Sequence, residues 1–327
     1  MNNKIDKNRP WLSVILPAFN EEEYIADCIT SVLSLNLLDD EYEIIVVDNN
    51  SADNTASIVK RFDKVRYRNL EVGNVGAVRN FGAREAEGSY LAFIDADCVV
   101  KPAWGSRAKS LVRANANTTY GGSCHAHKTA GWVEKYWLLT RNELPTLPKH
   151  LIGASILIPK SIFCKVGGFN EVVTSGEDTE LSIKIQRMGS SVILTHELDV
   201  LHLGNAKTLK DFFWRQVWQS ENYLKSPAES LRDPIFFLVL IFLTTLTATC
   251  FFLSKSLTLS FLLLISALII PLALSIKRAY RAKLSLFFFL KSLPGIYILD
   301  LVYLGGRSAG LLKSVLMDVW VLKKTNN

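Results

Sequence analysis

The sequence predicts an α/β domain with an open, largely parallel sheet, followed by transmembrane helices. Two observations support this fold class. Between residues 11 and 98, apolar stretches of strand length alternate with stretches of helical spacing, which is typical of βαβ units. In the last third of the 327 residues, two long apolar runs carry no charge.

The first half of the chain alternates predicted strands and helices in order. "WLSVILPAFN" is a strand halted at Pro17, and the acidic turn that follows begins a helix over residues 21–35. Asn50 or Ser51 is a suitable cap for a helix that includes Val59. Further strands are expected at residues 42–51, 64–70 and 89–98, with a helix over 75–88 closed by Gly88.

From about residue 120 the pattern becomes irregular, which indicates longer loops and a mixed second half of the same domain. Residues 176–189 form an amphipathic helix, and residues 191–204 supply one or two strands. The aromatic and basic stretch 208–225 predicts a helix at the membrane interface. We therefore expect an N-terminal α/β domain over 1–232, with an interfacial region at 206–232, and a membrane domain over 233–327.

Two runs are long enough to cross a bilayer. Residues 235–253 and 257–276 each approach the roughly 30 Å hydrocarbon thickness as helices. Buried core helices are the alternative, but runs this long and uncharged favour transmembrane spans. A third stretch, 284–304, is interrupted by Lys291, Pro294 and Asp300, so a re-entrant or interfacial hairpin fits it better than a span.

Positive charge predicts the orientation of these spans. The linker between them carries only Lys255, whereas basic residues gather before the first span and after the second. The positive-inside rule then places the N-terminal domain in the cytoplasm, as part of a multi-pass protein of the cell (inner) membrane. The basic residues concerned are Lys207, Lys210, Arg215, Lys225 and Arg232 before the first span, and those within 277–283 after the second.

Composition excludes several other classes. The net charge of +6 is modest. The sequence lacks the blocks of Lys and Arg with interleaved aromatic residues that would indicate a nucleic-acid partner. The five scattered cysteines lack metal-ligand spacing and are typical of reduced thiols in a cytosolic domain. The apolar run after Pro10 is too short for a signal peptide.

The stretch "LAFIDADCVV" ends an apolar strand on two carboxylates, Asp95 and Asp97. Because side chains alternate along a strand, both would converge on one point and repel unless a cation lies between them. Asp48 ends another strand, and ligands of open α/β sheets bind at such carboxyl ends. A solvated strand end is the alternative to the divalent-metal site that this pattern predicts.

Four stretches, taken together, resemble the inverting family 2 glycosyltransferases of GT-A fold, a Rossmann-like nucleotide-diphospho-sugar transferase fold. They are "VILPAFNEEEYIADCITSVL", "EIIVVDNNSADNT", "GAVRNFGAREAEGSYLAFIDADC" and "GGFNE…GEDTELSIKIQRMG". The resemblance covers roughly residues 11–205, and the order and spacing of its motifs make it specific. It implies transfer of a sugar from a nucleotide-sugar with the help of Mg²⁺ or Mn²⁺, held by a D-x-D motif.

The resemblance implies roles for residues on the donor side. Asp97 would bind the metal, and Asp95 would lie near the ribose or share the metal. Asp48 would accept from a uracil ring, although Asn49 stands where the family often has a second aspartate. Pro17, Ala18, Asn20 and Glu22 would frame the nucleotide. A turn-forming or helix-capping role is the alternative for Asp48.

Two basic residues have less specific roles. Arg79 would contact the donor diphosphate or help to close the pocket, and an ordinary surface arginine is the alternative. His202 would complete the metal shell or touch the diphosphate, and a structural histidine is the alternative.

On the acceptor side, the "GED" sequence provides a base. Inverting transfer needs a carboxylate that takes the proton of the attacking hydroxyl. The resemblance makes Asp178 this base, with Glu177 supporting the acceptor site; acidic residues favoured in a first helical turn are the alternative. "WRQVWQ" does not match the Q-x-x-R-W motif of processive synthases, and two spans are too few for a pore, so transfer of one sugar is expected.

The expected function is therefore a membrane-anchored, metal-dependent, inverting hexosyltransferase. Its donor would be UDP-linked, and its acceptor a lipid-linked saccharide or another membrane-proximal hydroxyl, in cell-surface polysaccharide or glycolipid synthesis. A polyprenyl-phosphate sugar synthase is the nearest alternative, although an ionised phosphate acceptor would need no base such as Asp178. A catalytically inactive membrane scaffold is a further alternative, and a transporter is excluded by the small number of spans.

Overall fold

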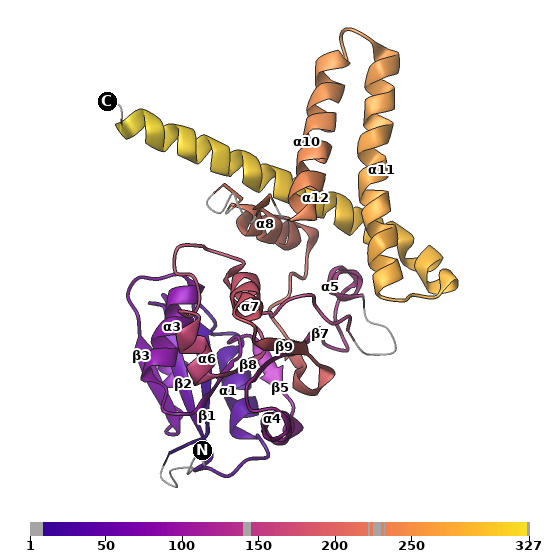
Figure 1. Ribbon diagram of the computed structural model, residues 1–327. Helices are drawn as coiled ribbons and strands as arrows, with labels where there is room; N and C mark the ends of the chain where they lie inside the picture. The colour runs from indigo at the N-terminus through magenta and orange to yellow at the C-terminus, as the bar shows by residue number, and fades with distance from the viewer. Residues whose placement is uncertain (1–8, 140–144, 222, 225–229, 232, 326–327) are drawn as a thin grey trace. The chain divides into compact units, whose positions relative to one another are not determined.

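The structure is a computed structural model that describes residues 9–139, 145–221, 223–224, 230–231 and 233–325, with side chains up to residue 316 (Figure 1). Lys225 and Arg232, which contribute to the expected charge asymmetry, lie outside these residues. The chain forms two units: residues 1–127 with 147–205, and residues 128–146 with 206–327. Each unit is described by itself.

A seven-stranded mixed sheet is the centre of the first unit, with strand order β3-β2-β1-β4-β8-β6-β9. The first four strands are parallel, β8 is antiparallel to both of its neighbours, and β9 is parallel to β6. This confirms the expected α/β fold with a mixed second half. The strands are β1 (Leu12–Ala18), β2 (Tyr42–Asp48), β3 (Val65–Asn69), β4 (Tyr90–Phe93), β6 (Thr118–Gly121), β8 (Ile156–Pro159) and β9 (Ser191–Leu194).

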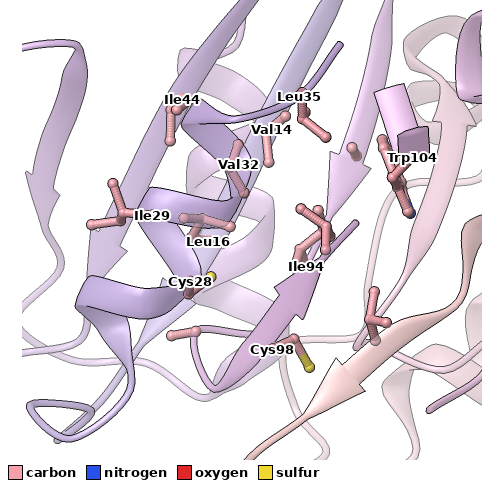
Figure 2. Packing of buried hydrophobic residues seen from close by; sticks show 14 of the residues in the cluster. Val14, Leu16, Cys28, Ile29, Val32, Leu35, Ile44, Ile94, Cys98 and Trp104 are labelled. Atoms are coloured by element: carbon pink, nitrogen blue, oxygen red, sulfur yellow. The ribbon is translucent and has the colours of Figure 1, made fainter. Parts of the chain in front are cut away.

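Helices cover both faces of this sheet because its central strands are apolar on both sides. Every residue of β1 is buried, and its alternate side chains enter two separate cores. Val14 and Leu16 pack with α1 (Ile25–Leu33), α2 (Thr55–Val59) and α4 (Ala103–Ala114), as Figure 2 shows in part. Ile15 faces the other core, which includes residues of α3 (Val75–Glu85), α6 (Lys160–Lys165) and α7 (Glu177–Arg187).

A second, three-stranded sheet has the order β5-β10-β7, formed by β5 (Cys98–Val100), β10 (Val200–His202) and β7 (Cys124–His125). The expected single strand over 89–98 is therefore wrong. The chain leaves the large sheet at Phe93 and enters the small one at Cys98, so the connection between two sheets carries both Asp95 and Asp97. Antiparallel pairing of β10 with β5 places His202 opposite Cys98.

The second unit contains α5 (Trp132–Leu138), α8 (Leu209–Ser220) and long apolar helices. By length and composition, α10 (Pro234–Phe252), α11 (Leu257–Arg281) and residues 286–316 of α12 (Leu286–Thr325) are candidate membrane spans. The hairpin expected within 284–304 is wrong, because α12 continues as one helix through Pro294.

Asp199 joins the small sheet to its surroundings through a buried hydrogen-bond network. Its Oδ1 accepts from the N–H of Ser123 at 2.7 Å and from the Ser123 hydroxyl at 2.5 Å. Its Oδ2 lies 3.0 Å from Nε2 of His125 and 2.7 Å from Nδ1 of His196. Burial raises the pKa of Asp199, but these hydrogen bonds outweigh it and hold that pKa below the ordinary 3.8.

We predict that Asp199→Asn lowers the free energy of unfolding by about 1.5–3 kcal/mol at neutral pH, because charged hydrogen bonds in a buried site are lost. Since the folded-state pKa is depressed, the stabilising effect of Asp199 is present above pH 3.8 and is lost as the pH falls through the lower, folded value. Chemical denaturation of the detergent-solubilised protein, followed by circular dichroism at several pH values, measures both effects.

Asp39→Asn is the matched control, because the Asp39–Lys64 ion pair is exposed and solvent screens it, so that its loss changes stability little. Equal stability losses for the two variants at neutral pH would contradict the role given to Asp199.

Candidate active site

Asp48 ends β2 at the carboxyl edge of the sheet, as expected, and its side chain is buried there. Its Oδ1 accepts from the hydroxyl of Ser51 at 2.5 Å and from the Ser51 N–H at 3.1 Å. Its Oδ2 accepts from the Tyr67 hydroxyl at 2.9 Å. Asn49 beside it donates to the carbonyl of Gly73 at 2.8 Å. Asp48 thus holds the loop after β2, and a nucleobase would have to share a carboxylate that already has these partners.

The loops that follow β1 and β2 are joined by reciprocal hydrogen bonds. Asn20, in the left-handed region with φ 56°, accepts from the N–H of Ala52 at 2.8 Å and donates its own N–H to Ser51. Glu22 accepts from the N–H and the side-chain amide of Asn54 at 3.0 and 2.7 Å. Pro17 and Ala18 are buried in β1 below these loops. The residues expected to frame the nucleotide therefore form one preorganised wall.

Arg79 is the residue that links the two halves of the site. Its side chain is only 3% exposed, which excludes the surface alternative. Its Nη2 donates to Oδ1 of Asp95 at 2.6 Å, and its Nη1 donates to Oε1 of Glu177 at 2.5 Å. The guanidinium also lies 5.3 Å from the ring centroid of Phe169. A residue of α3 thereby holds the strand-end aspartate and the first residue of α7 together.

Asp178 lies beside this link and is fixed by backbone donors. Its Oδ2 accepts from the N–H of Gly153 at 3.0 Å, and its Oδ1 accepts from its neighbour Thr179 at 2.6 Å. Gly153 itself packs on Arg79, because a Cβ at residue 153 would overlap the guanidinium. Only glycine leaves room at this position for both Arg79 and the hydrogen bond to Asp178.

The charges of this cluster depend on one another. Burial would lower the pKa of Arg79, but the carboxylates of Asp95 and Glu177 raise it, so the guanidinium stays protonated. Burial raises the pKa values of Glu177 and Asp178, and the charge of Arg79 opposes that rise. Asp178 is therefore a more basic carboxylate than an exposed aspartate, which suits a proton acceptor.

Asp97 takes a different partner from Asp95. Its Oδ2 lies 3.6 Å from Nε2 of His202, whose other ring nitrogen, Nδ1, is buried without a hydrogen-bond partner. Ligand atoms of Asp97, Cys98 and His202 all lie within 4.8 Å of one another. The expected convergence of Asp95 and Asp97 on one point is thus replaced by two adjacent clusters, one around Arg79 and one around His202.

This second cluster fits a hard divalent cation. Mg²⁺ and Mn²⁺ prefer carboxylate oxygen, and Mn²⁺ also accepts imidazole, so Asp97 and His202 are suitable ligands. Burial raises the pKa of Cys98 well above its ordinary value, which keeps the thiol protonated and unsuited to binding such an ion. Gly204 leaves space for Asp97, because a Cβ at residue 204 would overlap its carboxylate.

The sequence reasoning missed Tyr67, Gly153 and Gly204. Each acts through a close approach between segments far apart in the chain, and no local pattern distinguishes them from other residues of their type. Arg79 was expected at the site, but its buried position between two carboxylates has no sequence signal.

Comparison with known proteins shows what the sequence and the fold are similar to. Residues 13–166 match the model of "Glycosyl transferase family 2". The glycosyltransferase AglE of Haloferax volcanii is 29% identical over 205 residues, which are 59% of this chain and 67% of that protein. An uncharacterized glycosyltransferase of Rickettsia felis is 28% identical over 193 residues, but the chain spans only 32% of its length.

A solved structure shows the fold. The mannosyltransferase PcManGT of Pyrobaculum calidifontis, in complex with GDP-Man and Mn²⁺, superposes with a TM-score of 0.60 at 18% identity. The superposition covers 94% of this chain and 87% of that chain. The chain therefore has the α/β GT-A fold, matches the glycosyl transferase family 2 model over residues 13–166, and continues with long apolar helices.

Proposed function

We propose that this protein is a membrane-anchored, inverting hexosyltransferase that moves one sugar from a UDP-linked donor to a hydroxyl of a lipid-linked saccharide. The observation that carries this proposal is the pair of hydrogen bonds that Arg79 donates to Asp95 and Glu177. They hold Asp95, on the donor side, close to Glu177, the residue directly before Asp178. Asp178, whose pKa is raised by burial, thus lies beside the buried Arg79 guanidinium that also binds Asp95 on the donor side. Cell-surface polysaccharide or glycolipid synthesis would use such a transfer.

On the donor side, the wall formed by Asn20, Glu22 and their partners supports one face of the nucleotide. Asp48 would accept from the base, and Asp95 would lie near the ribose. The UDP assignment rests on the family resemblance, although Asn49 stands where the family often has a second aspartate. A panel of UDP- and GDP-sugars, assayed for transfer and for binding, tests it directly.

Asp97 and His202 would hold Mn²⁺ or Mg²⁺. The ion would offset the negative charge that grows on the leaving diphosphate. His202 is positioned for this role by the pairing of β10 with β5, and Asn205 donates to the His202 carbonyl at 3.0 Å. Asp97 is held through its own carbonyl, which accepts from the N–H of Leu203 at 2.8 Å.

Asp178 would act as the general base. As the acceptor oxygen attacks the anomeric carbon, its proton passes to the Asp178 carboxylate, and the bond from that carbon to the diphosphate breaks. The N–H groups of Gly153 and Thr179 fix the carboxylate orientation. Attack from the face opposite the leaving group inverts the anomeric centre.

Membrane anchoring supports a lipid-linked acceptor. The apolar helices would hold the catalytic unit beside the bilayer. The charge asymmetry of the chain favours a cytoplasmic position for that unit, where nucleotide-sugars would be available.

We predict that EDTA abolishes transfer reversibly and that Asp97→Ala removes both activity and Mn²⁺ binding. His202→Ala should weaken Mn²⁺ binding by about 10–100-fold, because one ligand is lost while the carboxylate remains. Electron paramagnetic resonance titration of free Mn²⁺ measures the binding independently of turnover. Full activity in excess EDTA would exclude the metal role.

We predict that Asp178→Asn lowers the transfer rate by roughly 10²–10⁴-fold while donor affinity stays near normal, because the amide keeps the shape but cannot accept the proton. Steady-state kinetics with a sugar-hydroxyl acceptor measure the rate, and calorimetry measures donor affinity. Glu180→Gln is the matched control, because Glu180 shares the first turn of α7 but binds Asn170 and Lys184 instead.

The same variant distinguishes this proposal from the nearest alternative, a polyprenyl-phosphate sugar synthase. A polyprenyl phosphate is already ionised, so Asp178→Asn would leave transfer to it almost unchanged. Near wild-type turnover on a hydroxyl acceptor would show that Asp178 only begins the helix.

We predict that Arg79→Lys lowers kcat by at least 10-fold, because a single ammonium cannot bridge Asp95 and Glu177 as a guanidinium does. Gly153→Ala should have the same effect, since its Cβ displaces Arg79 without changing any charge. Kinetics and thermal unfolding are compared for both variants. Loss of stability with unchanged kcat in the folded fraction would restrict Arg79 to a structural role.

A further inference from the structure

In helix α12, polar residues are buried or bound by neighbouring segments, and apolar residues are exposed. Asp300 is fully buried, and Arg307 is engaged by residues of α8. The exposed face instead carries aliphatic residues, spaced as one helical face. This apolar strip consists of Ile298, Leu301, Val302, Leu312 and Leu316, which are exposed or half-exposed. Lys313, an exposed charged residue within this span, is ion-paired with Glu221, the residue that follows α8.

Asp300, a buried polar residue of α12, is fixed at the last turns of α11. Nη1 of Arg278 donates to its Oδ1 at 2.5 Å, and the Ser275 hydroxyl donates to its Oδ2 at 2.7 Å. Nη2 of Arg278 also donates to the carbonyls of Tyr136 and Trp137 at 2.8 and 2.7 Å. Asp300 therefore lies at the level of the end of α11 and not beside the middle of that helix.

Arg307 is fixed near the start of α10. Its Nη2 donates to Oε1 of Gln219 at 2.9 Å, and its Nη1 donates to the Tyr223 hydroxyl at 3.2 Å. The Tyr223 ring packs on Phe236, in the first turn of α10, with centroids 5.1 Å apart. The start of α10 and the end of α11 are the same end of a helical hairpin, because only residues 253–256 connect the two helices.

Two glycines allow α12 to run close beside α8. A Cβ at Gly306 would meet Cβ of Gln216 at 2.7 Å, and a Cβ at Gly310 would overlap the Ser220 hydroxyl. Gly306 faces Gln216, and Gly310 faces Ser220. Because the residue numbers increase together along the two helices, α8 and α12 are parallel neighbours. By contrast, nothing lies within 4 Å of a Cβ at Gly305, on the opposite side of the helix.

These contacts decide how α12 is placed relative to the hairpin. Residues 300 and 313 are roughly 20 Å apart along a helix that rises about 1.5 Å per residue. A spanning helix would separate them by a similar depth. Yet Asp300 is held at the last turns of α11, and residues 307 and 313 are held by the segment that leads into α10. Figure 1 shows α12 lying across the hairpin's open end.

We propose that α12 lies in the plane of the membrane, with its apolar strip in the acyl-chain region and its polar face against α8 and α11. The apolar strip contacts the lipid bilayer. The exposed residues of the α10–α11 hairpin, such as Ile241 and Phe261, are also apolar, so that the strip and the hairpin present the same kind of surface to lipid. Trp214 and Trp218 are exposed on α8, next to Lys210 and Arg215, a composition suited to the headgroup level. The protein then has two spans, and its C-terminus lies on the side of its N-terminal domain.

Depth measurement by spin labelling tests this proposal in the full chain, reconstituted in phosphatidylcholine–phosphatidylglycerol nanodiscs. Labels are placed singly at Ile298, Leu312 and Leu316, in a background lacking the accessible cysteines Cys124, Cys164 and Cys250. Labels at Leu264 in α11 and at Tyr280 near its end provide the depth scale. Accessibility to oxygen and to a water-soluble nickel chelate is measured at each site.

We expect the three α12 labels to show high oxygen and low nickel accessibility, at depths that agree within about one helical turn of 5 Å. A monotonic change in depth of roughly 20 Å or more would show that α12 spans the bilayer. High nickel accessibility would place the strip in water. Dipolar broadening between singly labelled copies would make a second copy the occupant. Each of the last three results overturns the proposal.

A matched glycine pair and a fusion provide a second test. Gly306→Leu should separate α12 from α8 and change the depth of the label at Leu312, whereas Gly305→Leu should leave it unchanged. A reporter fused after Asn327 should lie on the same side as one fused after Lys283. Opposite sides for the two reporters, or equal effects of the two glycine variants, would contradict the in-plane helix.

Discussion

The buried guanidinium of Arg79 is the interaction on which the rest of the site depends. One cation binds carboxylates that come from two distant parts of the chain, the end of β4 and the start of α7. Three acidic side chains packed together without it would repel one another and would have to take up protons. The loss of one partner from a buried ion pair costs about 3–5 kcal/mol. The ion pairs of Arg79 therefore set the charge state of the site and also hold its segments rigidly together.

The α/β class was readable from the sequence because the strands of the first half are short, apolar and separated by helical spacing. The split between β4 and β5 was not readable. "SYLAFIDADC" has the pattern of one strand, and only the pairing of Cys98 with His202, more than a hundred residues later, makes the chain leave the large sheet. The continuous α12 was likewise hidden, because Pro294 and Asp300 look like interruptions until Arg278 is seen to pair with the aspartate.

For the site, the sequence pointed to Asp48, Asp95 and Asp97 at expected strand ends and to Asp178 through the family resemblance, but it did not assign the partners of these side chains. Period-two alternation predicts that Asp95 and Asp97 point the same way only while the backbone stays extended, and the chain turns between them. Gly153 shows the general limit. Its importance comes from the Arg79 side chain that fills the space of its absent Cβ, and a single sequence contains no trace of such a contact.

The parallel pairing of α8 with α12 has a consequence for biosynthesis. Helix α8 precedes α10 and α11 in the chain, yet the helix that covers Gln216 and Ser220, α12, follows both of them. Until the forty residues of α12 emerge, the polar groups of α8 that face it have no partner from α12. The second unit is thus completed only by α12, and a chain that stopped after α11 would keep both helices of the hairpin but leave this surface of α8 incomplete.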